Sequence, residues 1–178
     1  MDSRLIFVTG AHGVGKSHLA HSAARELNVA CFTASELIAA ELGRSSWDGN
    51  RHVSEMNKNQ DALLSAARGL RDRSASSLLL GYLVLRTTAG AHRRVSVKVL
   101  EQLRISGMVA ISASASTVLG RLRLRGDMSW TEPEIRSLLE NESEYATEVS
   151  RQMSVPLRVL FEPDELSFAA AVHGLLAY

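Results

Sequence analysis

Eight consecutive residues near the start of the chain have the types and spacing of a phosphate-binding loop: Gly10-Ala11-His12-Gly13-Val14-Gly15-Lys16-Ser17. Backbone N–H groups of a glycine-rich loop converge on an anion, and the N-terminus of a following helix adds partial positive charge. In this pattern the lysine reaches the β- and γ-phosphates and the serine hydroxyl binds Mg²⁺. We therefore expect residues 10–17, together with His18, to bind ATP, with Lys16 as a catalytic cation and Ser17 as the metal ligand.

The residues on either side of the loop agree with this expectation. An apolar run, Leu5-Ile6-Phe7-Val8, precedes the loop as a buried strand would. Apolar residues with helical spacing follow it. These are Leu19, Ala20, Ala23, Ala24 and Leu27. For His12, inside the loop, two roles stay open: contact with a phosphate, or a cap on the loop.

Composition limits the classes of protein to which the chain can belong. Its 178 residues are enough for one domain, expected over residues 1–178, and a formal charge of +1 argues against nucleic acid or anionic lipid as a partner. The single cysteine, Cys31, cannot form an internal disulfide, and we expect a buried structural thiol. No apolar run approaches the ~18 residues of a membrane span, and no signal peptide precedes the first strand. We expect a cytoplasmic protein.

Short apolar runs alternate with helical segments along the chain, which is typical of parallel βαβ units. We predict further strands at residues 29–33, 78–80 continuing through 82–85, 108–111 and 157–161. We predict helices at residues 34–42, 54–72, 96–104, 116–125 and 131–153, and a last helix that Asp164 caps. A turn is expected at residues 87–91.

The loop, the segment Thr33-Ala34-Ser35-Glu36-Leu37-Ile38, the pair Asn59-Gln60 and an arginine-bearing helix after the fourth strand together resemble the adenylate-kinase-like branch of P-loop proteins. The chain is most similar to the small ATP-binding proteins of that branch. The resemblance spans most of the chain, although only the loop is specific. It implies a three-layer α/β fold, with a five-stranded parallel sheet in the order 2-3-1-4-5 and helices on both faces. It also implies nucleotide binding at the carboxyl ends of the strands.

The resemblance further implies roles for three charged residues. Arg121 and Arg125 are four residues apart and share a helix face, next to a short lid expected near residues 126–131. In the family such arginines neutralise the transferring phosphates, a task that suits a planar, always-charged group. The alternative is a solvated face in an arginine-rich chain. Family position also makes Glu36 the group expected to orient a phosphoryl acceptor.

The chain departs from the family pattern at three positions. Many such kinases end the third strand in an Asp-Gly pair whose carboxylate holds the metal's hydration shell, and this chain has Leu80-Gly81. Arginines that bind an acceptor phosphate would stand near Ala39 and Val84. Arg44, Arg51 or Arg86 could replace them from loops.

Other candidate groups have simpler interpretations. His18 and His21 share a helix face without a visible third ligand, so a solvated pair is expected rather than a metal site. Four glutamates of the long helix are expected to form a solvated acidic face: Glu140, Glu142, Glu144 and Glu148. Carboxylates that could approach the metal from elsewhere are Glu36, Asp61 and Asp127. Trp47 and Trp130 lie in predicted loops, where they either stack on a base or are partly buried.

Three functions follow from these residues. The first is a small-molecule or nucleotide phosphotransferase, which moves a phosphoryl group from MgATP to a small hydroxyl or phosphate acceptor. The second is a nucleotide-binding regulatory module with little turnover, read by a protein partner, which the Leu80 departure favours. The third is an NTPase that uses water as the acceptor.

Overall fold

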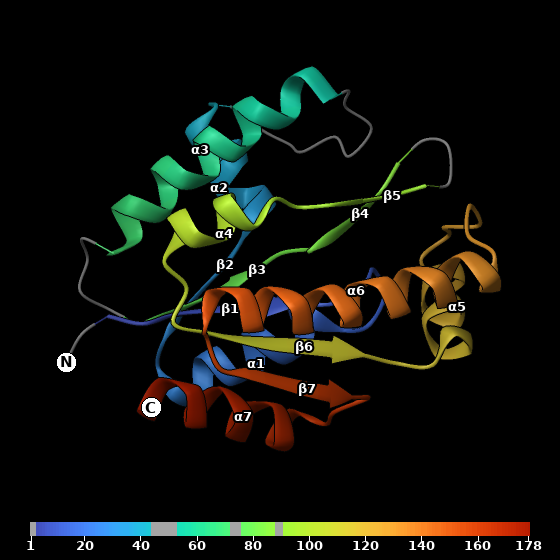
Figure 1. Cartoon of the computed structure of the whole chain (residues 1–178). Helices are drawn as coiled ribbons and strands as arrows, with labels where there is room; N and C mark the ends of the chain where they lie inside the picture. Colours follow the sequence, from blue (N-terminus) through green and yellow to red (C-terminus); the bar gives the residue numbers. More distant parts are fainter. Residues whose placement is uncertain (1–2, 44–52, 72–75, 88–90) are drawn as a thin grey trace.

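A computed structural model describes residues 3–43, 53–71, 76–87 and 91–178 of the chain (Figure 1). Arg44, Trp47 and Arg51, singled out above, lie outside these ranges. The elements follow in the order β1 (Leu5–Thr9), α1 (Lys16–Leu27), β2 (Ala30–Thr33), α2 (Ala34–Glu41), α3 (Val53–Arg71), β3 (Ser77–Leu80), β4 (Val84–Arg86), β5 (His92–Arg94), α4 (Val97–Leu103), β6 (Gly107–Ser112), α5 (Ala115–Leu124), α6 (Glu132–Met153), β7 (Leu157–Phe161) and α7 (Glu165–Ala177).

Five parallel strands form the central sheet in the order β2-β3-β1-β6-β7. Counted among the strands of this sheet alone, this is the order 2-3-1-4-5 that the resemblance implied. The labels of the last two strands are higher because β4 and β5 form a separate antiparallel hairpin. The α/β class and the parallel sheet are therefore confirmed.

The predicted continuation of the third strand through residue 85 is wrong. β3 ends at Leu80, and the next residue, Gly81, donates its N–H to the carbonyl of Val8 at 3.0 Å. The chain then leaves the sheet, and Val84 begins the hairpin strand β4. Leu83 and Val84 are apolar because they are buried, so the sequence looks like a continuing strand. Their N–H groups, however, donate to the side chain of Glu142 rather than to a neighbouring strand of the sheet.

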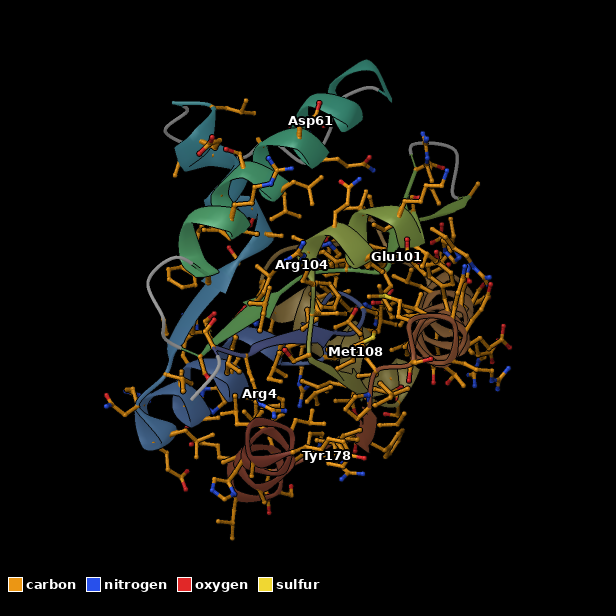
Figure 2. All side chains as sticks on the ribbon, turned by 60° about the vertical axis from the view of Figure 1, so that its left-hand side comes forward. Arg4, Asp61, Glu101, Arg104, Met108 and Tyr178 are labelled. Atoms are coloured by element: carbon orange, nitrogen blue, oxygen red, sulfur yellow. The ribbon has the colours of Figure 1, made fainter. Side chains whose placement is uncertain are left out.

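Helices cover both faces of the sheet (Figure 1). α1 and α7 pack together on one face, and α6 covers β6 and β7 on the other, with α4 and α3 beside it. The central strands are buried throughout; Met108 of β6, for example, lies in the interior between sheet and helices (Figure 2). This packing holds the carboxyl ends of β1 and β3 rigidly next to each other.

Two predicted helix starts are confirmed. Glu134 accepts a hydrogen bond from the N–H of Thr131 at 2.9 Å at the start of α6, and Asp164 accepts one from the N–H of Ser167 at 2.8 Å at the start of α7. Such caps satisfy N–H groups that have no partner inside the helix. Within the described ranges, the structure contains no helix that is both long and apolar enough to cross a membrane.

Candidate functional site: a phosphate loop and the groups around it

The loop between β1 and α1 has the backbone shape of an anion cradle. Gly10, Gly13 and Gly15 all have positive φ angles, of 147°, 80° and 101°. A Cβ atom at Gly13 would lie 3.0 Å from Cγ1 of the buried Val118, so a side chain there would press on α5 as well as strain the backbone at this φ. The glycines thus let the loop turn tightly against α5 and leave its N–H groups to face a ligand.

Lys16 lies buried at the floor of this loop, with 7% of its surface exposed. Its Nζ donates to the carbonyls of Gly10 at 2.5 Å and Ala11 at 3.0 Å, and it lies 4.0 Å from the ring centroid of Tyr82. Burial lowers the pKa of Lys16 to about 7, and the charge of Glu142 opposes this effect. A desolvated ammonium inside a glycine cradle fits a phosphate chain, whose oxygens would replace the loop carbonyls as acceptors.

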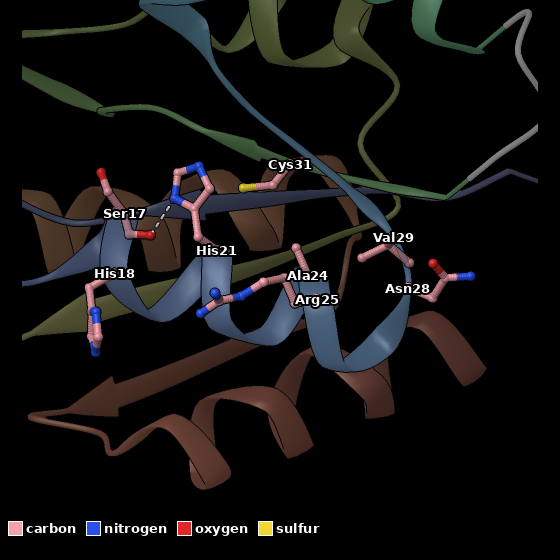
Figure 3. A pocket seen from close by; sticks show the side chains of 8 residues that line it. All are labelled: Ser17, His18, His21, Ala24, Arg25, Asn28, Val29 and Cys31. Carbon is pink, nitrogen blue, oxygen red and sulfur yellow. Dashed lines mark hydrogen bonds between the residues drawn. The ribbon is translucent and has the colours of Figure 1, made fainter.

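The first turn of α1 carries the predicted metal ligand. Ser17 is exposed beside Lys16, so its hydroxyl is accessible to a hydrated Mg²⁺, which prefers oxygen ligands. His18 and His21 are both exposed, as predicted, although each has a hydrogen-bond partner of its own. His18 lies 2.9 Å from Glu165 of α7, whereas Nδ1 of His21 lies 2.6 Å from the carbonyl oxygen of Ser17 (Figure 3).

An open groove of about 660 Å³ runs along α1 and β2 from Ser17 (Figure 3). His21, Arg25 and Cys31 are among its lining residues, so it meets the phosphate loop only at its Ser17 end. Cys31 is half-buried rather than fully buried, and burial raises the pKa of its thiol to about 11. The described part of the chain contains no cluster of three or more His, Cys, Asp or Glu side chains that could hold a metal ion.

The two predicted arginines are Arg121 of α5 and Arg125, the residue that caps the C-terminus of this helix. The guanidinium of Arg121 donates to the carbonyls of Gly13 at 3.2 Å and Val14 at 2.9 Å. The charge of Arg125 lies close enough to His12 to contribute to the lowering of its pKa. Arg121 therefore contacts the loop directly, and the charge of Arg125 acts on His12 within the loop; the part of either arginine in catalysis stays a prediction.

His12 is held by an aromatic neighbour. Its ring stacks on that of Tyr82 with centroids 4.3 Å apart, and Nδ1 lies 3.0 Å from the Tyr82 hydroxyl. Although His12 is exposed on one side, burial against Tyr82 and the charge of Lys16 lower its pKa to about 4. Burial, and then the charge of Glu142, raise the pKa of Tyr82 to about 12. Both rings are neutral at pH 7 and form one wall of the Lys16 pocket.

The segment between α5 and α6, predicted as a lid, approaches the stacked rings of His12 and Tyr82 through Trp130. This ring is 8% exposed, its Nε1 donates to Asp127 at 3.0 Å, and its centroid lies 6.4 Å from that of His12. The guanidinium of Arg86 on β4 lies 3.9 Å from the Trp130 centroid and donates to the carbonyl of Ser129 at 2.7 Å. Of the two roles left open for Trp130, base stacking or burial, the structure shows burial. The guanidinium of Arg86 is used in contacts with the lid segment.

Glu142 is the residue that the sequence interpretation missed. It was grouped with a solvated acidic face, but it is 3% exposed. Oε1 accepts from the N–H groups of Gly10 at 3.1 Å and Leu83 at 3.0 Å and from the Thr9 hydroxyl, and Oε2 accepts from the N–H of Val84 at 2.7 Å. A signal was available, because the glutamate follows Leu138 by four residues and precedes Tyr145 by three, which places it on the apolar stripe of α6.

The remaining predicted groups either lie away from the phosphate loop or are used in other hydrogen bonds. Oε2 of Glu36 accepts the N–H of Thr33 at 3.1 Å in the capping box of α2. Leu80 is 3% exposed and offers no oxygen to a metal. The carboxylate of Asp127 accepts hydrogen bonds from Ser129 and Trp130, which lower its pKa. Asp61 is exposed on α3 (Figure 2).

Several solved structures have the same fold along nearly the whole chain. A shikimate kinase from Bacteroides thetaiotaomicron is 16% identical, with a TM-score of 0.61 over 98% of this chain and 99% of that one. A shikimate kinase from Acinetobacter baumannii, solved with shikimate, is 14% identical, with a TM-score of 0.64 over 98% and 93%. A gluconokinase from Sinorhizobium meliloti 1021 is 13% identical, with a TM-score of 0.55 over 99% and 96%. At these identities the likeness establishes the fold alone.

The sequence comparison agrees with the geometry. No curated protein matches the chain in sequence. A family model described as an AAA domain matches residues 9–136, which begin at the end of β1 and include the phosphate loop, the Tyr82 segment, Arg121 and Arg125. The chain therefore belongs to this AAA-domain family, and it has the nucleoside-monophosphate-kinase-like P-loop fold.

Proposed function

We propose that this protein transfers the γ-phosphoryl group of MgATP to an oxygen of a small-molecule acceptor. The observation that carries the proposal is the buried ammonium of Lys16 on the floor of a glycine-shaped loop, with Arg121 and Arg125 beside the same loop. Phosphoryl transfer needs positioning and neutralisation of charge more than covalent chemistry by the protein. Three cations around one loop supply that neutralisation.

In the proposed reaction the acceptor oxygen forms a bond to the γ-phosphorus while the bond from that phosphorus to the β–γ bridging oxygen breaks. Lys16 and the arginines bind the phosphate oxygens and stabilise the charge that moves to the leaving group. Ser17 would hold Mg²⁺, which supplies further charge neutralisation between the β- and γ-phosphates. The segment at residues 126–131 would exclude water from the site.

Three observations bear on the acceptor. Ala39 and the buried Val84 stand where acceptor arginines would be expected, and Arg86 stacks on Trp130. These observations favour a hydroxyl-bearing acceptor over a nucleoside monophosphate. The shikimate kinase and gluconokinase folds belong to proteins named for hydroxyl-bearing acceptors, which supports the same class. Glu36 is the group that we propose to orient this hydroxyl, because among the described residues only its Oε2 is used, in the capping interaction with Thr33.

A second candidate function is a nucleotide-binding module with little turnover. Leu80 offers no carboxylate at the end of β3, and both oxygens of Glu142, which is buried near the loop, already accept hydrogen bonds. The metal's hydration shell would then lack an anchor, and bound nucleotide would set a conformation for a protein partner. The third function, hydrolysis with water as the acceptor, differs from the first only in the product.

A phosphorus NMR time course separates these functions. The protein is incubated with MgATP and a pool of sugars, polyols, hydroxy acids, nucleosides and nucleoside monophosphates, and Lys16→Ala serves as the control variant. A new phosphate ester formed only by the parent protein is the result expected for a kinase. Free phosphate alone would identify an NTPase. ATP that persists with shifted resonances would reject turnover in favour of the binding module.

A further inference from the structure

One buried carboxylate connects three separate parts of the candidate site. Glu142 extends from α6 and accepts hydrogen bonds from the phosphate loop at Gly10, from the end of β1 at Thr9, and from Leu83 and Val84 after β3. Oε1 receives three of these donors and Oε2 the fourth, so both oxygens are engaged. A carboxylate in this arrangement is a connector rather than a metal ligand.

The residues that Glu142 holds form the two walls around Lys16. The carbonyl of Gly10 accepts from Nζ of Lys16 at 2.5 Å, while its N–H is held by Glu142. On the other side, Tyr82 places its ring 4.0 Å from Nζ, and the next two N–H groups along the chain are held by the same carboxylate. The spacing between the walls is therefore set by one side chain.

A charged side chain at position 142 does more than fill space in the core. An apolar side chain would pack on the stripe of α6 without the cost of desolvating a charge, whereas removing the carboxylate leaves several buried donors without an acceptor. Buried polar networks that are fully satisfied fix one arrangement of the elements that they join. At Glu142 these elements are the phosphate loop, the segment after β3 and the helix that follows the lid segment.

We infer that Glu142 is a positioning residue that couples the phosphate loop to the segment at residues 81–84, so that nucleotide bound at the loop also orders this segment. For the effect on transfer, the inference rests on the proposed function, in which Lys16, 4.0 Å from the centroid of the Tyr82 ring, binds the phosphate oxygens. Coupling of this kind needs no movement of the backbone, because a ligand that stabilises one partner of a rigid network stabilises the other.

Hydrogen exchange of the whole protein, with and without saturating MgADP, tests the coupling directly. In the parent protein, we expect MgADP to slow exchange in peptides that cover both the loop and residues 81–86. In Glu142→Gln an N–H₂ group replaces one carboxylate oxygen and can no longer accept from a backbone N–H such as that of Val84. We therefore expect the loop to remain protected by MgADP while residues 81–86 exchange at least tenfold faster than in the parent. Glu144→Gln removes the same charge from an exposed position of α6 and should match the parent.

A milder variant keeps the test decisive if Glu142→Gln folds poorly. Thr9→Val removes one donor and leaves the three backbone donors in place. We expect a smaller loss of protection at residues 81–86, with exchange about threefold faster than in the parent protein. If MgADP protects this segment equally in the parent and in both variants, the inference is wrong.

Turnover gives a second readout that a purely structural role would not change. For Glu142→Gln we expect kcat to fall at least tenfold, while the Kd for MgADP measured by calorimetry stays within threefold of the parent value. A variant with a lower Tm but with the kcat of the parent would overturn the inference. Absence of turnover in the parent would reject the proposed phosphotransfer alone, since the exchange comparison still decides the coupling.

Discussion

Gly81 is the position where a single added methyl group should have a large effect. It follows β3 directly, and a Cβ atom built on it would lie 2.7 Å from both Cε2 and Cζ of Phe7. Phe7 is 3% exposed in the middle of the sheet, so its ring has little room to move. Overpacking of a tight core costs about 1–3 kcal/mol. For a chain of this length each kcal/mol lowers Tm by roughly 2–4 °C.

We therefore expect Gly81→Ala to lower Tm by about 3–10 °C, measured by differential scanning calorimetry without ligand. Gly120→Ala is the matched control, because Gly120 is exposed inside α5 with no atom within 4 Å of an added Cβ. That substitution should raise stability by about 0.5–1 kcal/mol, since it removes backbone freedom from the unfolded chain.

A double variant tests the stated cause. Phe7→Leu removes the ring atoms that the new methyl group would meet, so Gly81→Ala should cost at least about 1 kcal/mol less in that background than in the parent. Effects that simply add, or a Gly81→Ala protein with unchanged Tm, would refute the packing argument. In that case contact with the Phe7 ring would not be the reason why position 81 requires glycine.

Two further predictions concern the groups around the loop. The pKa of His12, followed by NMR of its ring, should be about 4, and Lys16→Met should raise it while burial keeps it below the ordinary value of 6.5; a value near 6.5 in the parent would contradict the close contact with Tyr82. Arg86→Met removes a cation 3.9 Å from the Trp130 centroid, a contact worth about 0.5–1 kcal/mol. Hydrogen exchange at residues 126–131 should then become roughly two- to fivefold faster, and an unchanged rate would show that the lid segment is held by other contacts.

The sequence alone determined the central part of the site and most of the fold. Glycines at fixed spacing followed by Lys16 and Ser17 can be recognised without coordinates, because the loop's function resides in its backbone and in local geometry. Alternating apolar and helical segments gave the parallel sheet, since each strand and helix buries a face that its own sequence displays. Helical spacing combined with family position predicted Arg121 and Arg125, and the structure places Arg121 against the loop.

Only the tertiary structure decided which other side chains reach that loop. Glu142 is 132 residues away from Gly10 in the chain, and its charge suggested solvent, although its spacing placed it on the buried stripe of α6. The break after Leu80 was hidden for a related reason, because Leu83 and Val84 are as apolar as strand residues but donate their N–H groups to that carboxylate. Contacts between distant segments depend on how whole helices and strands pack, and local residue spacing does not indicate which segments will meet.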